Sequence, residues 1–193
     1  MTTVHSSADL TTERLVLRAW RMSDAAAALE TYGHVDVARW LSPDLAMVPD
    51  LPAMRLLLAQ WLADADRIAP CGRWAIERVG DQRVIGGASL LPLPPGDEDL
   101  AIGWQLSPDA WRAGYASETT FALATWAFGH GASEVFAVVR PENTRAAATV
   151  REHGMHWVGE TSKYFGLDLQ VFRLRAADLD RAAPQGHHPP HLD

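Results

Sequence analysis

Residues 102–118 have the sequence Ile-Gly-Trp-Gln-Leu-Ser-Pro-Asp-Ala-Trp-Arg-Ala-Gly-Tyr-Ala-Ser-Glu, and this stretch decides the fold. It combines the end of an alternating strand, a turn that contains Gly114, and the start of a helix. The free backbone N–H groups of a helix start, together with the helix dipole, favour an anion. Gly114 lets the backbone come close to a phosphate, and Arg112 adds a charged donor. The pattern predicts a phosphate cradle of unspecified kind, although a plain tight turn into a helix has the same features.

Periodic segments surround this stretch on both sides. On the N-terminal side we expect strands and two helices, in the order strand 14–18, helix 24–32, helix 52–62, strand 74–79, strand 83–91 and strand 100–106. On the C-terminal side we expect helix 116–129, strand 135–139, helix 143–153, strand 157–163 and strand 169–174. Antiparallel strands followed by alternating strands and helices predict a mixed α/β sheet.

The chain of 193 residues is long enough for one substantial core and short for two. We expect a single domain at residues 12–179. Residues 1–11 are predicted to be a flexible N-terminal arm. Residues 180–193 are rich in Ala, Pro and His and are predicted to be a disordered tail.

The cradle sequence resembles the pyrophosphate-binding loop of the GNAT superfamily of N-acetyltransferases. Trp111 precedes the loop and Gly114-Tyr115-Ala116 lies within it, as in the RimJ/RimL-like branch. Asn143 and Gly154 have the spacing of a second family element, although an Asn before a helix is also simply a good N-cap. The resemblance covers residues 11–179. It implies the GNAT fold, a mixed α/β fold whose mostly antiparallel central sheet contains a splayed parallel pair of strands, here 103–106 and 135–139, and is flanked by helices.

The resemblance also implies the binding site of acetyl-CoA, the co-substrate, and no metal. Asn143 would help to hold the pantetheine arm, and a backbone N–H near Gln105 and Leu106, up to Ser107, would stabilise the oxyanion. The pyrophosphate would be held by the backbone amides of Arg112, Ala113, Gly114, Tyr115, Ala116 and Ser117. Glu118 follows the loop, and we interpret it as a structural residue of the first helical turn.

The groups that move protons do not stand at the usual family positions in this sequence. Ala101 stands where the branch often has a Glu, so Glu98 and Asp99 are the candidate bases, acting through water. The same acidic residues also fit a solvated loop. Ala146 and Val150 occupy the usual places of the general acid. Three hydroxyl side chains could replace it, as could solvent: Tyr164, Thr149 and Tyr115.

Three functions fit these features. The first is an acetyl-CoA-dependent N-acetyltransferase that acts by direct transfer in a ternary complex on a primary amine, which is a small amine, an antibiotic amino group or a protein N-terminus. The second is a non-catalytic acyl-CoA-binding sensor, which Ala101, Ala146 and Val150 favour. The third is a transferase that uses a larger acyl-CoA. The resemblance implies that residues 32–66 and 159–168 choose the acceptor, with Trp40 and Trp61 as candidate wall residues.

Composition excludes several partners. A formal charge of −7 with Lys163 as the one lysine argues against nucleic-acid binding. No apolar run is long enough to cross a bilayer, and the N-terminus has no secretory pattern. The lone Cys71 fits a cytoplasmic protein. The histidines have no metal-binding spacing. The family contains monomers and homodimers, and the sequence does not choose between them.

Overall fold

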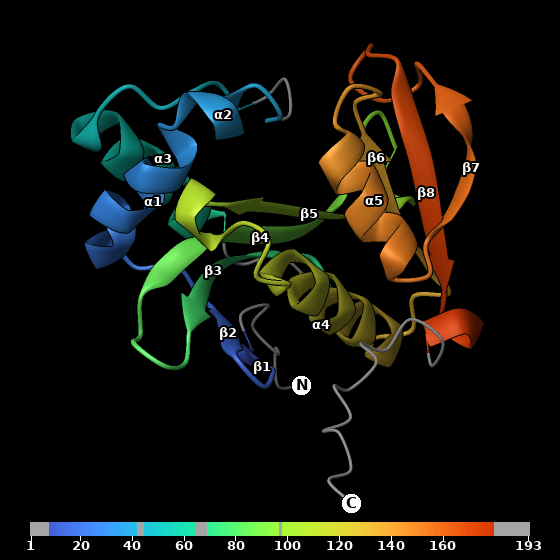
Figure 1. Cartoon of the computed structure of the whole chain (residues 1–193), viewed down its shortest axis with the longest axis horizontal. Coiled ribbons are helices and arrows are strands. Elements are labelled where there is room, and N and C mark those ends of the chain that lie inside the picture. Colours follow the sequence, from blue (N-terminus) through green and yellow to red (C-terminus); the bar gives the residue numbers. More distant parts are fainter. Residues whose placement is uncertain (1–7, 42–44, 65–68, 97, 180–193) are drawn as a thin grey trace, which may run out of the picture.

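The computed structural model describes residues 8–41, 45–64, 69–96 and 98–179 (Figure 1). Within them lies one eight-stranded sheet with the order β1-β2-β3-β4-β5-β6-β8-β7. Its strands are β1 Leu10–Thr11, β2 Leu15–Arg18, β3 Gly72–Arg78, β4 Val84–Pro92, β5 Leu100–Leu106, β6 Glu134–Val139, β7 His156–Thr161 and β8 Leu169–Arg175. The helices are η1 Met22–Asp24, α1 Ala25–Tyr32, α2 Val35–Ala38, α3 Leu51–Ala63, η2 Pro108–Ala110, α4 Tyr115–Gly129, α5 Thr144–Glu152 and η3 Ala176–Asp178.

One pair of neighbouring strands differs from the rest. All other neighbours pair antiparallel, whereas β5 and β6 run parallel and share a single register position, Ala101 opposite Phe136. Beyond this position the two strands separate, so their facing backbone groups do not form a continuous ladder. The predicted mixed α/β sheet with one splayed parallel pair is confirmed.

The two largest apolar cores lie on opposite faces of the sheet, and a third, smaller cluster contains Leu93, Tyr164, Leu169 and Val171. Successive residues of a strand point to opposite faces, and Trp74 and Ile76 of β3 accordingly join one core while Ala75 joins the other. The first core packs the sheet against α4 and α5, and includes Leu123 and Val150. The second packs it against the helices α1–α3. Helices therefore cover both faces of the sheet and leave the β5–β6 gap between them.

The chain termini differ in part from the expectation. The predicted flexible arm does not extend to Leu10 and Thr11, which pair with Leu17 and Val16 as strand β1. The indole nitrogen of Trp74 also donates a hydrogen bond to the carbonyl of Ala8, at 3.3 Å. Main-chain pairing and this contact hold the end of the arm against the sheet. The rest of the predicted arm, 1–7, and the predicted tail, 180–193, lie outside the described residues.

One α-helix among the described residues was not expected from the sequence. Helix α2 is a single turn that begins after His34, whose ring Nδ1 accepts a hydrogen bond from the amide of Asp36 at 3.2 Å. Val37 on this turn packs into the second core. The turn is too short to show a helical period in the sequence, so its existence depends on tertiary packing.

Candidate functional site: a cavity between the parallel strands

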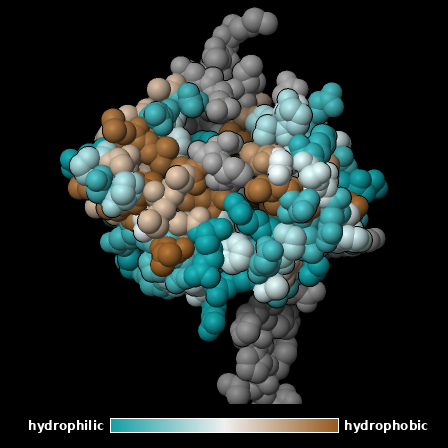
Figure 2. Space-filling model, turned by 90° about the horizontal axis from the view of Figure 1, so that it is seen from above, coloured by the Kyte–Doolittle hydropathy of each residue, from teal (hydrophilic) through white to brown (hydrophobic). Residues whose placement is uncertain are grey.

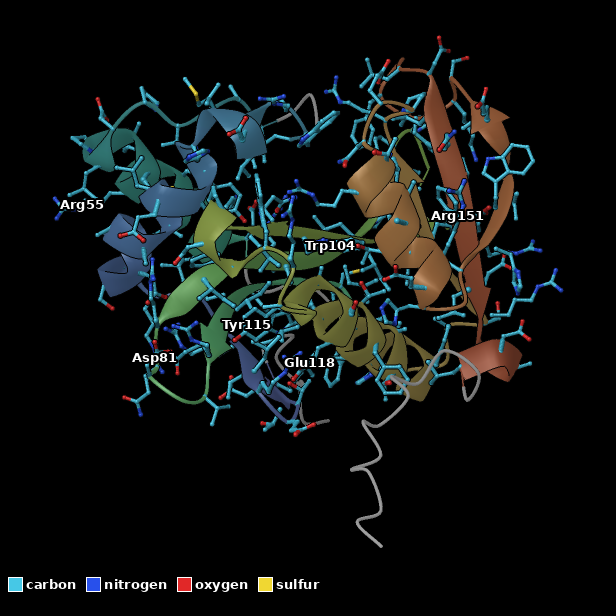
Figure 3. All side chains as sticks on the ribbon, viewed as in Figure 1. Arg55, Asp81, Trp104, Tyr115, Glu118 and Arg151 are labelled. Atoms are coloured by element: carbon cyan, nitrogen blue, oxygen red, sulfur yellow. The ribbon has the colours of Figure 1, made fainter. Side chains whose placement is uncertain are left out.

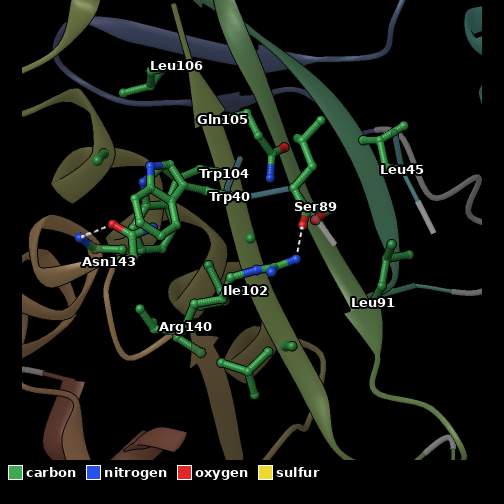
Figure 4. Close-up of a pocket in the computed structure, with 18 of the residues that line it drawn as sticks. Trp40, Leu45, Ser89, Leu91, Ile102, Trp104, Gln105, Leu106, Arg140 and Asn143 are labelled. Atoms are coloured by element: carbon green, nitrogen blue, oxygen red, sulfur yellow. Dashed lines mark hydrogen bonds between the residues drawn. The ribbon is translucent and has the colours of Figure 1, made fainter. Parts of the chain in front are cut away.

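A cavity of about 1210 Å³ opens where β5 and β6 separate. Its walls come from β4, β5 and β6, the starts of α4 and α5, and the α2–α3 region. Figure 4 shows Asn143 and Trp104 on one side of β5, and Leu45 and Leu91 on the other. Segments far apart in the chain thus meet around one open cavity.

The loop before α4 is the segment predicted to form an anion cradle. Arg112 and Gly114 both have left-handed backbone conformations, with φ of 65° and 81°. No side chain caps α4, and the amide of Glu118 makes the first hydrogen bond of the helix, to the carbonyl of Gly114. The amides of the preceding residues are therefore not used inside the helix. All of the loop residues from Trp111 to Ser117 except Ala113 line the cavity.

Three contacts hold this loop in place. The Arg14 guanidinium donates a hydrogen bond to the carbonyl of Ala113 at 2.8 Å. The indole of Trp111 donates to the carbonyl of Leu106 at 2.9 Å. Arg145 lies 4.3 Å above the Trp111 ring and joins the start of α5 to the loop. The cradle is therefore fixed by β2, β5 and α5 before any ligand binds.

The backbone of β5 presents alternate amides to its two neighbours. The amide of Ser107 donates to the carbonyl of Ile85 at 2.9 Å, so it is committed to β4. Because antiparallel pairing alternates, the amide of Gln105 faces β4 as well, whereas that of Leu106 faces the gap. Gln105 and Leu106 both line the cavity, and the side chain of Gln105 accepts a hydrogen bond from Tyr32 at 3.2 Å. Leu106 is the residue of this trio whose amide faces the gap.

Asn143 lies at the other wall of the cavity. Its side-chain oxygen accepts a hydrogen bond from the amide of Ala146 at 3.1 Å, which makes it the N-cap of α5 (Figure 4). The same residue lines the cavity. The helix-cap interpretation is confirmed, and the geometry allows the residue to contact a ligand as well.

The loop before α4, the β5–β6 gap and the capping Asn143 all lie within a segment that matches a known protein family. The acetyltransferase (GNAT) domain profile matches residues 14–156. The chain belongs to the GNAT acetyltransferase family. It is 26% identical over 157 residues to YoaA of Bacillus subtilis (strain 168), an uncharacterized N-acetyltransferase, with 80% of this chain and 86% of that protein covered.

Solved structures agree with the fold of this GNAT enzyme. An acetyltransferase from Agrobacterium tumefaciens str. C58 is 25% identical and superposes with a TM-score of 0.71, covering 91% of this chain and 98% of that one. Mycobacterium smegmatis RimJ, crystallised with CoA-disulfide, is 21% identical with a TM-score of 0.68, covering 88% of this chain and 85% of that one. Family membership makes the chain a transferase that takes an acyl group from acetyl-CoA.

The three candidate catalytic residues of this GNAT enzyme lie outside the cavity wall. Glu98 is exposed, and neither it nor Asp99 nor Tyr164 lines the cavity. Asp99 accepts hydrogen bonds from the Tyr164 hydroxyl at 2.8 Å and from Lys163 at 3.0 Å. Tyr164 and Lys163 lower the pKa of the Asp99 carboxyl. Burial and the neighbouring carboxylate raise the pKa of the Tyr164 hydroxyl. The structure thus brings Asp99 and Tyr164 together, but not to the gap.

Glu118 has a structural role, as its position in the first turn of α4 suggested, but its partners lie on the N-terminal segment. Its carboxylate accepts hydrogen bonds from the Thr12 hydroxyl and from the amide and Nε of Arg14, the latter two at 2.8 Å. Figure 3 shows Glu118 and Tyr115 at the start of α4, beside the N-terminal strands. The residue connects this helix to the N-terminal segment and does not cap the amides of its own helix.

Arg145 and Trp104 are two of the cavity residues that sequence reasoning did not single out as site residues. Arg145 sits in the first turn of α5 and Trp104 in the middle of β5, and both line the cavity. Arg145 directly follows the Asn143 element, which could have drawn attention to it. No sequence signal separates Trp104 from a core tryptophan, because its exposure depends on the separation of β5 from β6.

Two kinds of feature are absent from the part of the chain that the structure describes. No helix there is both long and apolar enough to cross a membrane. The His, Cys, Asp and Glu side chains of the described residues form no group of three that could hold a metal ion.

Proposed function

We propose that this GNAT enzyme transfers the acetyl group of acetyl-CoA directly to a primary amine in a ternary complex. One observation carries the proposal: a single cavity joins the amide cradle, the β5–β6 gap and a chamber beyond the gap. Donor and acceptor can therefore meet without a covalent enzyme intermediate. The acceptor is a small amine, an antibiotic amino group or a protein N-terminus.

The residues present fit the phosphate end of CoA. The cradle amides have no acceptor in their own helix, and Arg112 and Arg145 add positive charge beside them. In the proposal these groups hold the pyrophosphate, and Asn143 contacts the pantetheine arm across the gap. The backbone alone supplies most donors, so the site depends on loop conformation more than on side-chain identity.

The chemistry needs a polarised thioester carbonyl and a neutral amine. Acetyl-CoA supplies an activated acetyl group; a C–N bond forms, the C–S bond breaks, and CoA leaves as the thiol. The amide of Leu106 faces the gap and can donate a hydrogen bond to the thioester oxygen. The gap therefore carries the donor that this chemistry requires.

Water is the proposed carrier of the amine proton. Glu98 and Asp99 can receive it only through water, because neither lines the cavity. Tyr164 is bonded to Asp99, so the proposal assigns reprotonation of the leaving thiolate to solvent. A thiol with a pKa near 8.5 needs little help at neutral pH.

The decisive experiment measures acetyl-CoA binding by calorimetry and thiol release with a panel of amines in the same buffer. We expect both binding and amine-dependent thiol release. The position of Asp99 and Tyr164 outside the wall favours a second candidate, a non-catalytic acyl-CoA-binding module. Binding without thiol release across the panel would select that candidate. Titration with longer acyl-CoA donors tests whether the acetyl donor is the preferred one.

A further inference from the structure

The part of the cavity beyond the gap forms an apolar chamber. We define this acceptor chamber by six wall residues from the segment between α2 and α3, from α3, and from the loops that follow β4 and β7: Trp40, Leu45, Leu57, Trp61, Leu93 and Phe165. These elements lie along the upper edge of the molecule in Figure 1, whereas α4 begins below β5. Seen from above in Figure 2, apolar residues gather on the side that carries α1–α3. The chamber is thus the end of the cavity away from the anion cradle.

Trp61 gives the chamber a rigid aromatic wall. Its ring lies 5.6 Å from that of Trp20 and 5.2 Å from that of Tyr32, between centroids. The hydroxyl of Tyr32 is in turn bonded to Gln105 on β5. Packing on several sides leaves Trp61 only 8% exposed. A preformed aromatic surface of this kind favours a flat or branched apolar partner over a hydrated one.

The charges around the chamber do not suit a polycation. The charged residues of the described cavity wall are Arg73, Arg112, Arg140 and Arg145 against Asp64, Glu142 and Glu152. The guanidinium of Arg73 lies 5.4 Å from the Trp61 ring centroid, and Arg140 reaches across the gap to donate to the carbonyl of Leu41 at 3.1 Å. Four arginines therefore face three carboxylates along the cavity wall. The net charge of −7 steers cations at long range, but the chamber offers too few carboxylates to pair several ammonium groups.

We infer that the acceptor is a primary monoamine carried on a compact apolar body, preferably an aromatic one, and not a polyamine or a multiply charged aminosugar. This inference rests on the proposed amine acetylation and names its substrate class. The body of the acceptor packs against Trp61, Leu57 and Phe165, and its amino group reaches toward the gap. Desolvation of a single amine is a small cost, whereas burial of several unpaired ammonium groups is a large one.

The first test compares kcat/KM for 2-phenylethylamine, spermidine and kanamycin with acetyl-CoA at one pH. We expect the aromatic monoamine to be preferred by about tenfold or more, in line with the discrimination of an apolar pocket. Equal or higher kcat/KM for spermidine or kanamycin would overturn the inference and leave amine acetylation standing. Thiol release with none of the amines, despite acetyl-CoA binding by calorimetry, would overturn both.

A matched pair of variants on α3 tests the location. Leu57 lines the chamber, whereas Leu56 is 68% exposed and does not. Leu57→Asp places a carboxylate on the wall and should lower kcat/KM for 2-phenylethylamine by about tenfold while raising that for spermidine. Leu56→Asp should change neither value. Acetyl-CoA affinity should be the same in both variants, and equal effects of the two substitutions on acceptor preference would contradict the assignment of the chamber.

Discussion

Gly114 carries two constraints at a single position. Its φ of 81° lies in the left-handed region, and a Cβ there would come within 3.2 Å of an Arg14 guanidinium nitrogen. The left-handed φ affects the stability of the fold, whereas the close approach to Arg14 affects the shape of the cradle. Gly131 has the first without the second, because its φ is 89° and a Cβ would meet nothing within 4 Å.

The two glycines therefore form a matched pair for acetyl-CoA binding. Gly114→Ala and Gly131→Ala should each lower the free energy of unfolding by about 1 kcal/mol, the cost of a side chain in this conformation. Only Gly114→Ala should also weaken acetyl-CoA binding, by about tenfold in calorimetry, or about 1.4 kcal/mol. The cradle assignment fails if the two variants bind acetyl-CoA equally well.

Asn143 also combines a structural and a proposed binding role, and two substitutions separate them. Asn143→Ala removes the cap and should lower the free energy of unfolding by about 1 kcal/mol. Asn143→Asp keeps the capping oxygen but loses the amide nitrogen. If that nitrogen contacts the pantetheine arm, both variants bind acetyl-CoA less tightly while only Ala is destabilised. Unchanged affinity in Asn143→Asp would leave the residue as a cap alone.

At the scale of elements, the Asp99–Tyr164 hydrogen bond joins the segment before β5 to the loop between β7 and β8. Each of these segments contributes to the cavity wall, Leu93 on one and Phe165 on the other. Tyr164→Phe removes only the hydroxyl. It should raise KM for the acceptor by about twofold to tenfold, the worth of one hydrogen bond, and leave kcat and acetyl-CoA affinity unchanged.

The same measurement distinguishes wall support from proton transfer. If Asp99 were the general base, Asp99→Asn would lower kcat by about a hundredfold or more and remove the acidic limb of the pH–rate profile. A support role predicts a KM effect with the profile intact. Glu98→Gln is the parallel test of the exposed neighbour, and an unaltered profile would remove Glu98 as a base.

The contact between α4 and the N-terminal segment predicts a pH dependence of stability. Burial opposes ionisation of Glu118, but hydrogen bonds from Thr12 and Arg14 outweigh it and lower the pKa below its ordinary value of 4.5. A lowered folded-state pKa means that the stabilisation is complete above 4.5 and is lost as the pH falls through the folded value. Urea unfolding should show a gap between the parent and Glu118→Gln at about pH 7 that narrows below about pH 4. A gap that stays constant with pH would contradict the ion-pair account.

At the scale of the whole molecule, Arg18 connects three elements between the two cores. It bonds Asp24 at the start of α1 at 2.8 Å and Glu77 on β3 at 2.6 Å, and its side chain is 6% exposed. Asp24, despite burial, and then Glu77 raise the pKa of the guanidinium, so it is charged at every accessible pH. Tyr32 at the end of α1 donates a hydrogen bond to Gln105, a residue of the cavity wall. The Arg18 network therefore helps to hold the helix that supports this wall.

Removal of this buried cation should destabilise the fold as a whole. Arg18→Met leaves Asp24 and Glu77 without their partner, and we expect a loss of about 3–5 kcal/mol in the free energy of unfolding by urea. Arg78 pairs with Asp81 at an exposed turn, so Arg78→Met should change stability little. Similar losses in the two variants would contradict the importance of burial.

The sequence by itself determined the features that depend on neighbours along the chain. The turn at Gly114, the cap at Asn143 and the order of strands and helices follow from side-chain period, glycine conformation and capping chemistry, all of which act over a few residues. The splayed parallel pair of strands and the donor, acetyl-CoA, were then inferred from the match of these segments to the GNAT family.

Only the tertiary structure decided how the distant parts meet. Asp99 and Tyr164 look like free catalytic groups in the sequence, and folding bonds them to each other away from the gap. Trp61 and Arg73 become one wall of the chamber, and the overall negative charge does not predict the balance of charge there. The physical reason is that burial, pairing and separation of charges are set by contacts between segments far apart in the chain, which no local pattern encodes.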